Sequence, residues 1–319
     1  RTDAGPAQGT IWDPGTYTVS YLATDGAGLT VVCSFEVTVT DNQNPELLCP
    51  SNIVLADSDD GLCSWESDSQ VAPSLDTDNC PYTLTHEITG ATTAVAGTAG
   101  SAEGTVLNVG ISTICYTITE DDNDMLVSTC CFDVEVVDDE DPTIVCPGDI
   151  AMDNDGGECG SVVTYEDPVT ADNCVLPAVS LVQTGGLPSG SEFPVGTTTN
   201  TFVVTDGAGN TASCSFDVVI TDTEDPMITC PTDVVAVTSD GGTGDCQANY
   251  AWTHPTATDN CGLESYTVTY TNPDGSIDGP DNTNVGSTST ALIAGNRNFD
   301  LGVTTVTYFA EDAAGNTAE

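Results

Sequence analysis

The stretch Ile220-Thr-Asp-Thr-Glu-Asp-Pro-Met-Ile-Thr-Cys-Pro231 occurs in three versions along the chain and decides the fold. The other two are Val39-Thr-Asp-Asn-Gln-Asn-Pro-Glu-Leu-Leu-Cys-Pro50 and Val136-Val-Asp-Asp-Glu-Asp-Pro-Thr-Ile-Val-Cys-Pro147. Each runs from a β-branched segment through acidic or amide residues to a proline and a second short apolar segment. Because proline fixes φ and has no amide hydrogen, it interrupts the sheet between the two segments. The stretch is typical of a joint between two β-domains, and its oxygen-rich side chains indicate a cation that stiffens the joint.

A second motif recurs four times between and beside the joints. It occupies Pro14–Leu29, Val109–Asp124, Val195–Asn210 and Leu301–Asn316. Alternating Thr, Val and Tyr residues predict strands of period two, and the Asp-Gly-Ala-Gly-Asn ending of the third copy predicts a turn. The segment Ala212–Ile220 then predicts the return strand of a hairpin, and helical periodicity is absent throughout. The sequence therefore predicts an all-β protein.

The joints divide the chain into repeats of the size of a β-sandwich domain. We name them repeats 1 to 4 and expect the following domains: 1–44, the C-terminal half of a domain; 45–140, a domain with an Ala/Gly/Thr-rich insertion at Gly90–Gly104; 141–224, a complete domain; and 225–319, a domain that lacks its last strand. The pattern favours a window cut from a longer array over subunits that complement each other by strand donation.

The composition is strongly acidic, with 50 Asp and Glu against 2 basic residues and a net charge of -48. This charge argues against nucleic acid or an anionic membrane as a partner, since both require basic surfaces. Self-repulsion also destabilises a compact chain unless counter-ions bind. Carboxylate oxygens are abundant and histidine is nearly absent, which favours Ca²⁺ over transition metals. A solvated surface, as in salt-adapted proteins, explains part of the acidity and does not exclude calcium.

Fourteen cysteines without a Cys-x-x-Cys pair indicate disulfides rather than zinc. An oxidising, extracellular or cell-surface location follows. No apolar run reaches membrane-spanning length, so we expect no membrane insertion in this segment. No signal peptide opens the chain, and we expect export and anchoring signals to lie outside it.

Shorter motifs follow one another in an order that resembles the hyalin repeat (HYR) domain over the whole chain. The best copy lies in repeat 3: Cys146-Pro147, Gly157-Glu-Cys159, Asp172-Asn-Cys174, Phe193 to Thr199, Thr205 to Asn210 and Cys214-Ser-Phe216. Repeat 2 departs from it, with Asp122-Asn-Asp-Met125 in place of Gly-Ala-Gly-Asn. The resemblance implies tandem immunoglobulin-like β-sandwich domains arranged end to end, as in extracellular adhesive proteins.

The sandwich that the resemblance implies also suggests disulfides within repeats. Its first and last strands lie side by side, which pairs Cys49–Cys130 and Cys146–Cys214 and leaves Cys63–Cys80, Cys159–Cys174 and Cys246–Cys261. A cross-strand bridge Cys115–Cys131 is compatible with the hairpin of repeat 2, while Cys33 and Cys230 lack partners. A rival scheme bridges each joint, Cys33–Cys49, Cys130–Cys146 and Cys214–Cys230. We prefer the first, because a return strand separates the rival pairs by about 20 Å at ~3.3 Å per residue.

The same topology brings each joint near two loops of the following repeat, the Asp-Asn-Cys loop and the hairpin turn. We expect Ca²⁺ to bind there, as a structural ion between domains. The ligands expected at the third joint are Asp222, Glu224, Asp225, Asp259, Asn260, Asp312 and Asn316. Those expected at the second are Asp138, Glu140, Asp141, Asp172, Asn173, Asp206 and Asn210. Those expected at the first are Asp41, Asn44, Asp78, Asn79, Asp121 and Asn123. The alternative is that these residues form turns by capping their own backbone.

The functional hypothesis is structural: a disulfide-stapled, calcium-stiffened stalk or filament for cell-surface adhesion or matrix. The alternative is an adhesin that binds a glycan or protein ligand through unrepeated loops, for which Gly90–Gly104 and Asn272–Arg297 are the candidates. Self-association into fibres is compatible with both. Catalysis is not indicated, because His86 and His254, the only histidines, lie in different repeats without a repeated nucleophile nearby.

Overall fold

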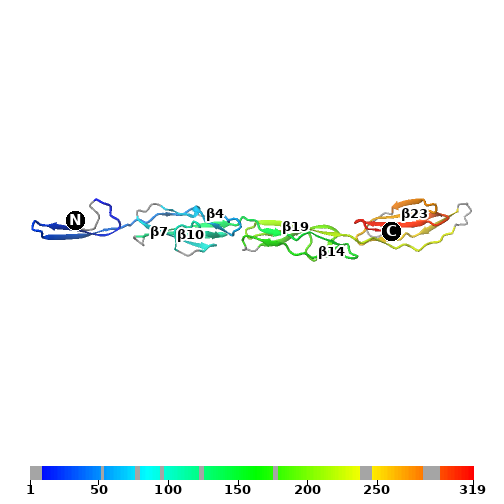
Figure 1. Ribbon diagram of the computed structural model, residues 1–319, viewed down its shortest axis with the longest axis horizontal. Helices are drawn as coiled ribbons and strands as arrows, with labels where there is room; N and C mark the ends of the chain where they lie inside the picture. Colours follow the sequence, from blue (N-terminus) through cyan, green and yellow to red (C-terminus); the bar gives the residue numbers. More distant parts are fainter. Residues whose placement is uncertain are drawn as a thin grey trace. The chain divides into compact units, whose positions relative to one another are not determined.

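The computed structural model describes residues 9–51, 54–75, 80–93, 97–121, 126–174, 179–237, 246–282 and 295–319. These residues form β-strands and one 3₁₀ turn, η1 (Ser69–Val71), with no α-helix among them (Figure 1). The all-β prediction is confirmed. In the described part of the chain, no helix has the length and apolar character needed to cross a membrane.

The chain forms two compact units. Unit 1 comprises Arg1–Pro142 with Asp172–Ala178 and Asp206–Asn210, and unit 2 comprises Thr143–Ala171, Val179–Thr205 and Thr211–Glu319. Two loops of repeat 3 therefore pack with unit 1, and we describe each unit by itself.

Unit 1 begins with a two-stranded antiparallel sheet, β1 (Gly15–Thr24) and β2 (Thr30–Val39). Its alternating pattern places Tyr21 and Phe35 on the same face, where their rings stack at 6.3 Å. The turn is held by the Asp25 carboxylate, whose Oδ1 accepts hydrogen bonds from the backbone amides of Ala27 and Leu29 at 2.9 Å.

Repeat 2 supplies the larger part of unit 1. One sheet has the order β4 (Val54–Asp57), β11 (Val127–Val137), β10 (Gly110–Glu120), β7 (Tyr82–Gly90) and β8 (Thr98–Ala99). The opposing layer contains the pairs β3 (Leu47–Leu48) with β6 (Ser74–Leu75), and β5 (Ser64–Glu66) with β9 (Val106–Asn108). Tyr116 and Phe132 of the first sheet and Leu107 of the second layer are buried in one core, because alternate residues of each strand face inward.

Unit 2 contains two further sheets of this kind (Figure 1). The first has the order β13 (Ile150–Asp153), β19 (Thr211–Thr221), β18 (Gly196–Thr205) and β16 (Ser180–Gly185). It is accompanied by β12 (Thr143–Val145) with β15 (Val169–Ala171), and β14 (Gly160–Val163) with β17 (Ser191–Pro194). Phe193, Phe202 and Phe216 fill its core.

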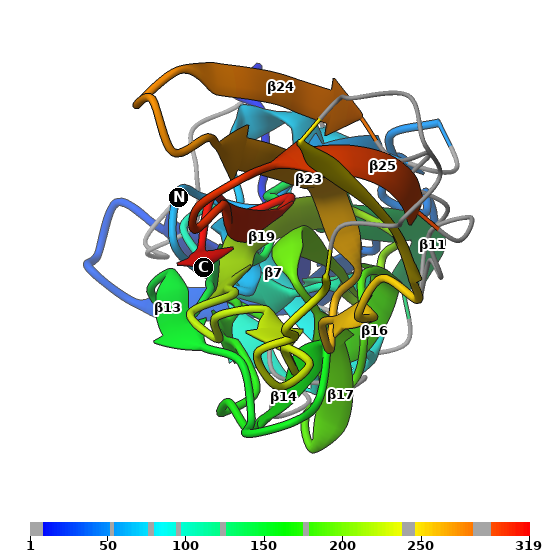
Figure 2. The same cartoon turned by 90° about the vertical axis from the view of Figure 1, so that its right-hand side faces the viewer.

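The second sheet of unit 2 has the order β24 (Ile277–Asn282), β23 (Leu263–Thr271), β26 (Thr305–Asp312) and β27 (Thr317–Ala318). Figure 2 shows β24 beside β23. The pairs β20 (Met227–Ile228) with β22 (Ala257–Thr258), and β21 (Gln247–Trp252) with β25 (Gly295–Asp300), complete this repeat. Tyr266 and Tyr308 lie in its core.

Three disulfides lie within repeats. Cys49–Cys130 and Cys146–Cys214 each have a Cα–Cα distance of 5.8 Å, and Cys115–Cys131 joins two residues that face each other across β10 and β11. These pairs are those that the sandwich topology implied. None of the rival bridges across the joints is present among the described residues, where Cys33 and Cys230 are exposed and lie outside any disulfide.

The Gly90–Gly104 insertion packs against its own repeat. Ala102 is fully buried in the core, and its backbone amide donates a hydrogen bond to the Tyr116 hydroxyl at 2.9 Å. Tyr116 in turn donates to the carbonyl of Val71 at 2.9 Å. Residues 94–96 of the insertion lie outside the described part. Ala102 thus anchors the described part of this insertion in the core of its own sandwich.

A buried histidine makes repeat 4 sensitive to acid. His254 Nδ1 lies 2.9 Å from the Tyr308 hydroxyl, which also accepts a hydrogen bond from Trp252 Nε1 at 2.9 Å. Burial lowers the pKa of His254 from its ordinary value of 6.5. The unfolded chain therefore takes up the proton first. Stability is complete above the unfolded pKa and falls as the pH drops from there towards the lowered native pKa.

We expect urea unfolding to show this loss as a slope of at most about 1.4 kcal/mol per pH unit below about pH 6.5. The His254→Gln variant keeps a hydrogen-bonding side chain that does not titrate and should lack that part of the slope. An equal pH dependence in the two proteins would contradict the assignment to His254.

Candidate metal sites

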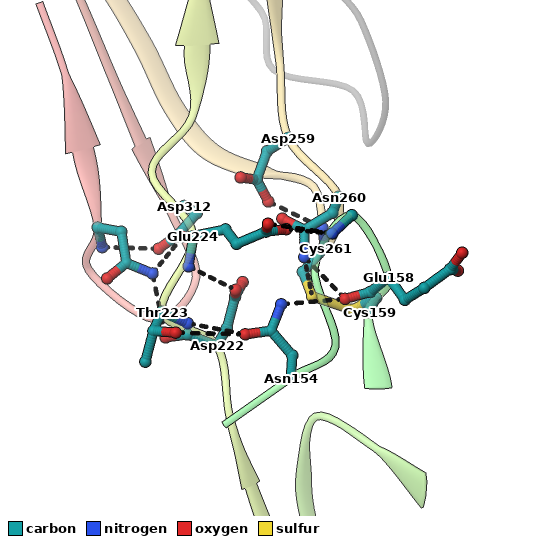
Figure 3. Close-up of a disulfide and its surroundings, with 12 residues drawn as sticks. Asn154, Glu158, Cys159, Asp222, Thr223, Glu224, Asp259, Asn260, Cys261 and Asp312 are labelled. Carbon is teal, nitrogen blue, oxygen red and sulfur yellow. Dashed lines mark hydrogen bonds between the residues drawn. A yellow bond between two sulfur atoms is a disulfide. The ribbon is translucent and has the colours of Figure 1, made fainter. Parts of the chain in front are cut away.

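Three carboxylates converge at each of two places in the described chain. Cluster 1, in unit 1, consists of Asp138, Asp172 and Asp206, and cluster 2, in unit 2, consists of Asp222, Asp259 and Asp312. In each cluster the three residues offer oxygen atoms that lie within 4.8 Å of one another. Figure 3 shows the members of cluster 2 approaching from three separate segments.

The strands explain why these side chains meet. Asp138 and Asp222 directly follow β11 and β19, the strands that lead into the joints. Asp172 and Asp259 follow the short strands β15 and β22. Asp206 follows β18, and Asp312 is the last residue of β26. Each carboxylate is therefore carried by the rigid end of a strand, and the same three motif positions are used in both clusters.

The hairpin aspartates accept hydrogen bonds from donors of their own turns. Burial alone would raise the pKa of Asp206, but the Asn210 side chain and the backbone amides of Ala208, Gly209 and Asn210 donate to it and lower its pKa. Asn210 Nδ2 also donates to the carbonyl oxygen of Asp138 at 3.0 Å. This amide group ties the turn to the joint.

Cluster 2 repeats this arrangement. Asn316 donates through its backbone amide and through Nδ2 to the two carboxylate oxygens of Asp312, each at 2.8 Å. The same Nδ2 donates to the carbonyl oxygen of Asp222 at 3.1 Å. Asn210 and Asn316, expected as metal ligands, therefore use their amide nitrogens to position the hairpin carboxylates.

The Asp-Asn-Cys aspartates have pKa values that are shifted upwards. Burial raises the pKa of Asp172, the Cys174 amide partly offsets this, and the carboxylates of Asp138 and Asp206 raise the pKa further. Burial likewise raises the pKa of Asp259, with Cys261 opposing it. The neighbouring Asp222 and Asp312 add to that rise. The clusters are thus crowded with negative charge, which a bound cation would relieve.

The clusters and the asparagines next to them also contain buried oxygens without hydrogen-bond partners. Asp222 is 4% exposed, and its Oδ2 has no partner in the described chain. Oδ1 of Asp259 and Asn260, and Oδ1 of Asp172 and Asn173, are also buried atoms without a hydrogen-bond partner in the described chain. All five atoms can only accept, and a buried acceptor without a partner costs about 1–3 kcal/mol. A hard cation fits this donor set, because it would bind several oxygens at once.

The joint glutamates do not belong to the clusters. Glu140 Oε1 accepts a hydrogen bond from the Gly61 amide at 2.6 Å, and both carboxylate oxygens of Glu224 accept from the Gly157 amide at 3.0 and 2.9 Å. Glu140 and Glu224, expected as metal ligands, thus each hold the Gly-x-Cys loop of the preceding sandwich. Asp141 and Asp225 are exposed and also lie outside the clusters.

Three predicted disulfide pairings are wrong. The structure joins Cys63 to Cys174 and Cys159 to Cys261, with Cα–Cα distances of 4.8 Å, in place of Cys63–Cys80 and Cys159–Cys174. The expected pair Cys246–Cys261 is therefore also wrong, and Cys246 is exposed. The physical reason is that the Gly-x-Cys loops of repeats 2 and 3 each meet the Asp-Asn-Cys loop of the following repeat.

Hydrogen bonds beside each of these disulfides hold the two loops together. Asn173 Nδ2 donates to the Leu62 carbonyl at 3.1 Å and to Asp138 Oδ1 at 3.2 Å. Asn260 Nδ2 donates to the Glu158 carbonyl at 2.9 Å (Figure 3). We call Cys63–Cys174 and Cys159–Cys261 the joint disulfides.

The first joint is described only in part. Asp41 accepts hydrogen bonds from the Gln43 amide at 2.9 Å and from Cys80 Sγ at 2.8 Å, while Asn44 is exposed. Asp121 is exposed and accepts from Thr83 Oγ1 at 2.6 Å. The other expected ligands, Asp78, Asn79 and Asn123, lie outside the described residues.

Sequence reasoning missed Glu120. It is fully buried and stands at the end of β10, the motif position that Asp206 and Asp312 hold in the later repeats. Aligning the Thr-Glu step of repeat 2 with Thr205-Asp206 would have found it. Choosing Asp121 shifted the register by one residue, which moves a side chain to the other face of a strand.

Comparison with known proteins gives a consistent result. Residues 137–220 match the family model of the HYR domain. Hyalin from Strongylocentrotus purpuratus is 32% identical over 261 residues, 80% of this chain and 20% of hyalin. Hyalin from Lytechinus variegatus is 29% identical over 267 residues, 82% of this chain and 47% of that protein. The chain thus spans about a fifth of the first relative and about half of the second.

Among solved structures, the Drosophila N-cadherin EC1-3 fragment covers 85% of this chain and 96% of its own, at 12% identity and a TM-score of 0.34. A superposition this loose carries no argument about function.

Proposed function

With residues 137–220 taken as an HYR domain, we propose that the chain is a structural segment of an extracellular adhesive or matrix protein, built from tandem sandwich domains whose joints bind Ca²⁺. The domains would be those expected at 45–140, 141–224 and 225–319, with 1–44 as part of another. The observation that carries the proposal is the pair of buried carboxylate clusters at the joints, with acceptor atoms that no donor satisfies. The five disulfides of the described residues support an oxidising, extracellular location.

The oxygen ligands of the clusters favour calcium over magnesium. Each cluster offers aspartate carboxylates and a neighbouring asparagine carbonyl, with no histidine or thiolate among its members. Calcium takes six to eight oxygens in irregular geometry, whereas magnesium demands a near-ideal octahedron at shorter distances. Oxygens gathered from three loops suit the first ion better than the second.

The cation would act mechanically. In each cluster one carboxylate comes from the joint, one from the Asp-Asn-Cys loop and one from the hairpin turn. A bound ion would draw these three segments together, and without it their charges repel one another. We infer that calcium stiffens each joint and that the chain works as a stalk or filament.

The proposal predicts two specific calcium ions on the described part of the chain, with a raised melting temperature and a stiffer chain. Equilibrium dialysis would count the ions, and thermal unfolding with small-angle scattering in millimolar calcium and then in chelator would report stability and stiffness. Because an ion that binds only the folded state raises stability by mass action, chelation should lower the melting temperature. If dialysis detects no bound calcium, and melting and scattering are the same in calcium and in chelator, the clusters are solvated turns. The glycan- or protein-binding adhesin then becomes the leading alternative.

A further inference from the structure

Each joint disulfide is connected directly to its cluster. The amide of Cys174 donates to Asp172 Oδ2 at 3.0 Å, and the amide of Cys261 donates to Asp259 Oδ2 at 2.8 Å. The other oxygen of each aspartate, Oδ1, is the buried acceptor without a partner. The loop that the disulfide anchors is therefore the loop that presents a cation ligand.

The other half of each joint disulfide is connected to the same cluster by a different path. Cys159 lies two residues after Gly157, whose amide donates to Glu224, and Glu224 lies two residues after Asp222. The Glu224 amide also donates to Asp222 Oδ1 at 3.2 Å. Covalent and hydrogen bonds thus form a continuous path from Asp222 through the disulfide to Asp259 (Figure 3).

Cluster 1 has the same path. It runs from Asp138 through Glu140 to the Gly61 amide, across Cys63–Cys174, and back through the Cys174 amide to Asp172. The recurrence at both joints shows that this connection belongs to the repeat.

We propose that cation binding and the joint disulfides are thermodynamically coupled, so that an oxidised joint binds calcium more tightly and a calcium-loaded joint resists reduction. This inference rests on the proposed calcium function. It adds a redox control of joint stiffness that acts through the Gly-x-Cys and Asp-Asn-Cys loops.

Electrostatic repulsion supplies the coupling. Without a cation, the three carboxylates of a cluster repel one another, and the disulfide holds the Asp-Asn-Cys loop in place against that force. Once the bond is reduced, the Asp-Asn-Cys loop is free to move away. Cation binding must then also offset the conformational entropy that is lost when the loop returns to the cluster. Because linkage is reciprocal, the factor by which oxidation tightens calcium binding is the factor by which calcium disfavours reduction.

The redox step is ordinary thiol–disulfide exchange. Two electrons and two protons convert each disulfide into two thiols, and a dithiol such as dithiothreitol supplies both while it closes to its own cyclic disulfide.

The five disulfides provide internal controls in one experiment. The oxidised 319-residue chain is brought to equilibrium with a fixed ratio of reduced to oxidised dithiothreitol in calcium or in chelator at equal ionic strength, free thiols are alkylated, and each bond is quantified by peptide mass spectrometry. We expect calcium to shift the thiol–disulfide equilibrium of Cys63–Cys174 and Cys159–Cys261 about tenfold towards the disulfide, within the usual range of coupling between sites, and to change the other three bonds by less than about twofold.

Two variants localise the effect. Asp222→Asn removes a cluster 2 ligand that lies on neither cysteine loop, so protection of Cys159–Cys261 should disappear while Cys63–Cys174 stays protected. Asp153→Asn makes the same charge change at an exposed position outside the clusters and should behave like the parent protein.

A paired serine variant tests the reciprocal effect. Cys159→Ser with Cys261→Ser should weaken calcium binding at one of the two sites about tenfold, whereas Cys115→Ser with Cys131→Ser should leave both affinities unchanged.

The outcomes separate the coupling from the proposed function. Calcium bound in dialysis, with all five bonds protected equally or none protected, would overturn the coupling and leave the calcium joints standing. No calcium bound in dialysis would overturn both. Selective protection of the joint disulfides, lost only at the mutated cluster, would establish the coupling.

Discussion

Replacing Asp222 and Asp259 together by asparagine should stabilise the protein in chelator and destabilise it in calcium. In chelator the double variant should melt above the parent, because two of the three clustered charges are gone. In each residue one carboxylate oxygen accepts a backbone hydrogen bond and the other, Asp222 Oδ2 or Asp259 Oδ1, has no partner. An amide can keep the first contact and place its NH₂ group at the second position, where it donates to a neighbouring carboxylate. The gain should be on the order of 1 kcal/mol.

In calcium the order should invert, because the variant has lost the ligands that bind the ion. A site filled at 100 times its Kd contributes about 2.7 kcal/mol, so the parent should become the more stable protein by a few degrees. Differential scanning calorimetry of both proteins in each buffer measures the crossing, and Asp153→Asn serves as the charge-matched control. A variant that is less stable than the parent in both buffers would mean that the two carboxylates stabilise the fold even without calcium.

Gly186→Ala should be among the most destabilising single changes in repeat 3. Gly186 has φ +81°, and an added Cβ would overlap Asn200 Oδ1 and lie 2.8 Å from Asn200 Cα. Asn200 is fully buried, and its Oδ1 accepts hydrogen bonds from the Leu187 amide at 2.8 Å and from Gln183 Nε2 at 3.2 Å. The alanine must displace this acceptor, which leaves buried donors unsatisfied in addition to the backbone strain. We expect a loss of about 3–5 kcal/mol of unfolding free energy.

Gly190→Ala is the matched control for this substitution. Gly190 has a similar φ of +84°, but no atom lies within 4 Å of the position of an added Cβ. Only the conformational strain remains, so the cost should be about 1–2 kcal/mol. Urea unfolding of the two variants separates the clash from the strain. Equal losses would show that the Asn200 contacts contribute little to stability.

The all-β fold, the strand-forming segments and the hairpins follow from local sequence. Alternation of apolar and polar residues assigns strands because one face of each sheet is buried, and prolines in the joints end the ladders because they cannot donate. The acidic residues of the clusters were also recognisable. The positions of Asp222, Asp259 and Asp312 are repeated by Asp138, Asp172 and Asp206, at the same places relative to strand ends. The same alternation separates Glu120, buried at its strand end, from the exposed Asp121.

Only the tertiary structure decided which of those residues meet. Glu224 and Asp222 are two residues apart in the same acidic run, yet one binds the Gly157 amide and the other enters cluster 2. Cys159 could not be assigned to Cys261 from spacing, since disulfide partners are chosen by distance between loops that are far apart along the chain. Sequence determines strands through local periodicity, whereas cation ligands and disulfide partners depend on how successive sandwiches pack, and that packing leaves no periodic trace in the sequence.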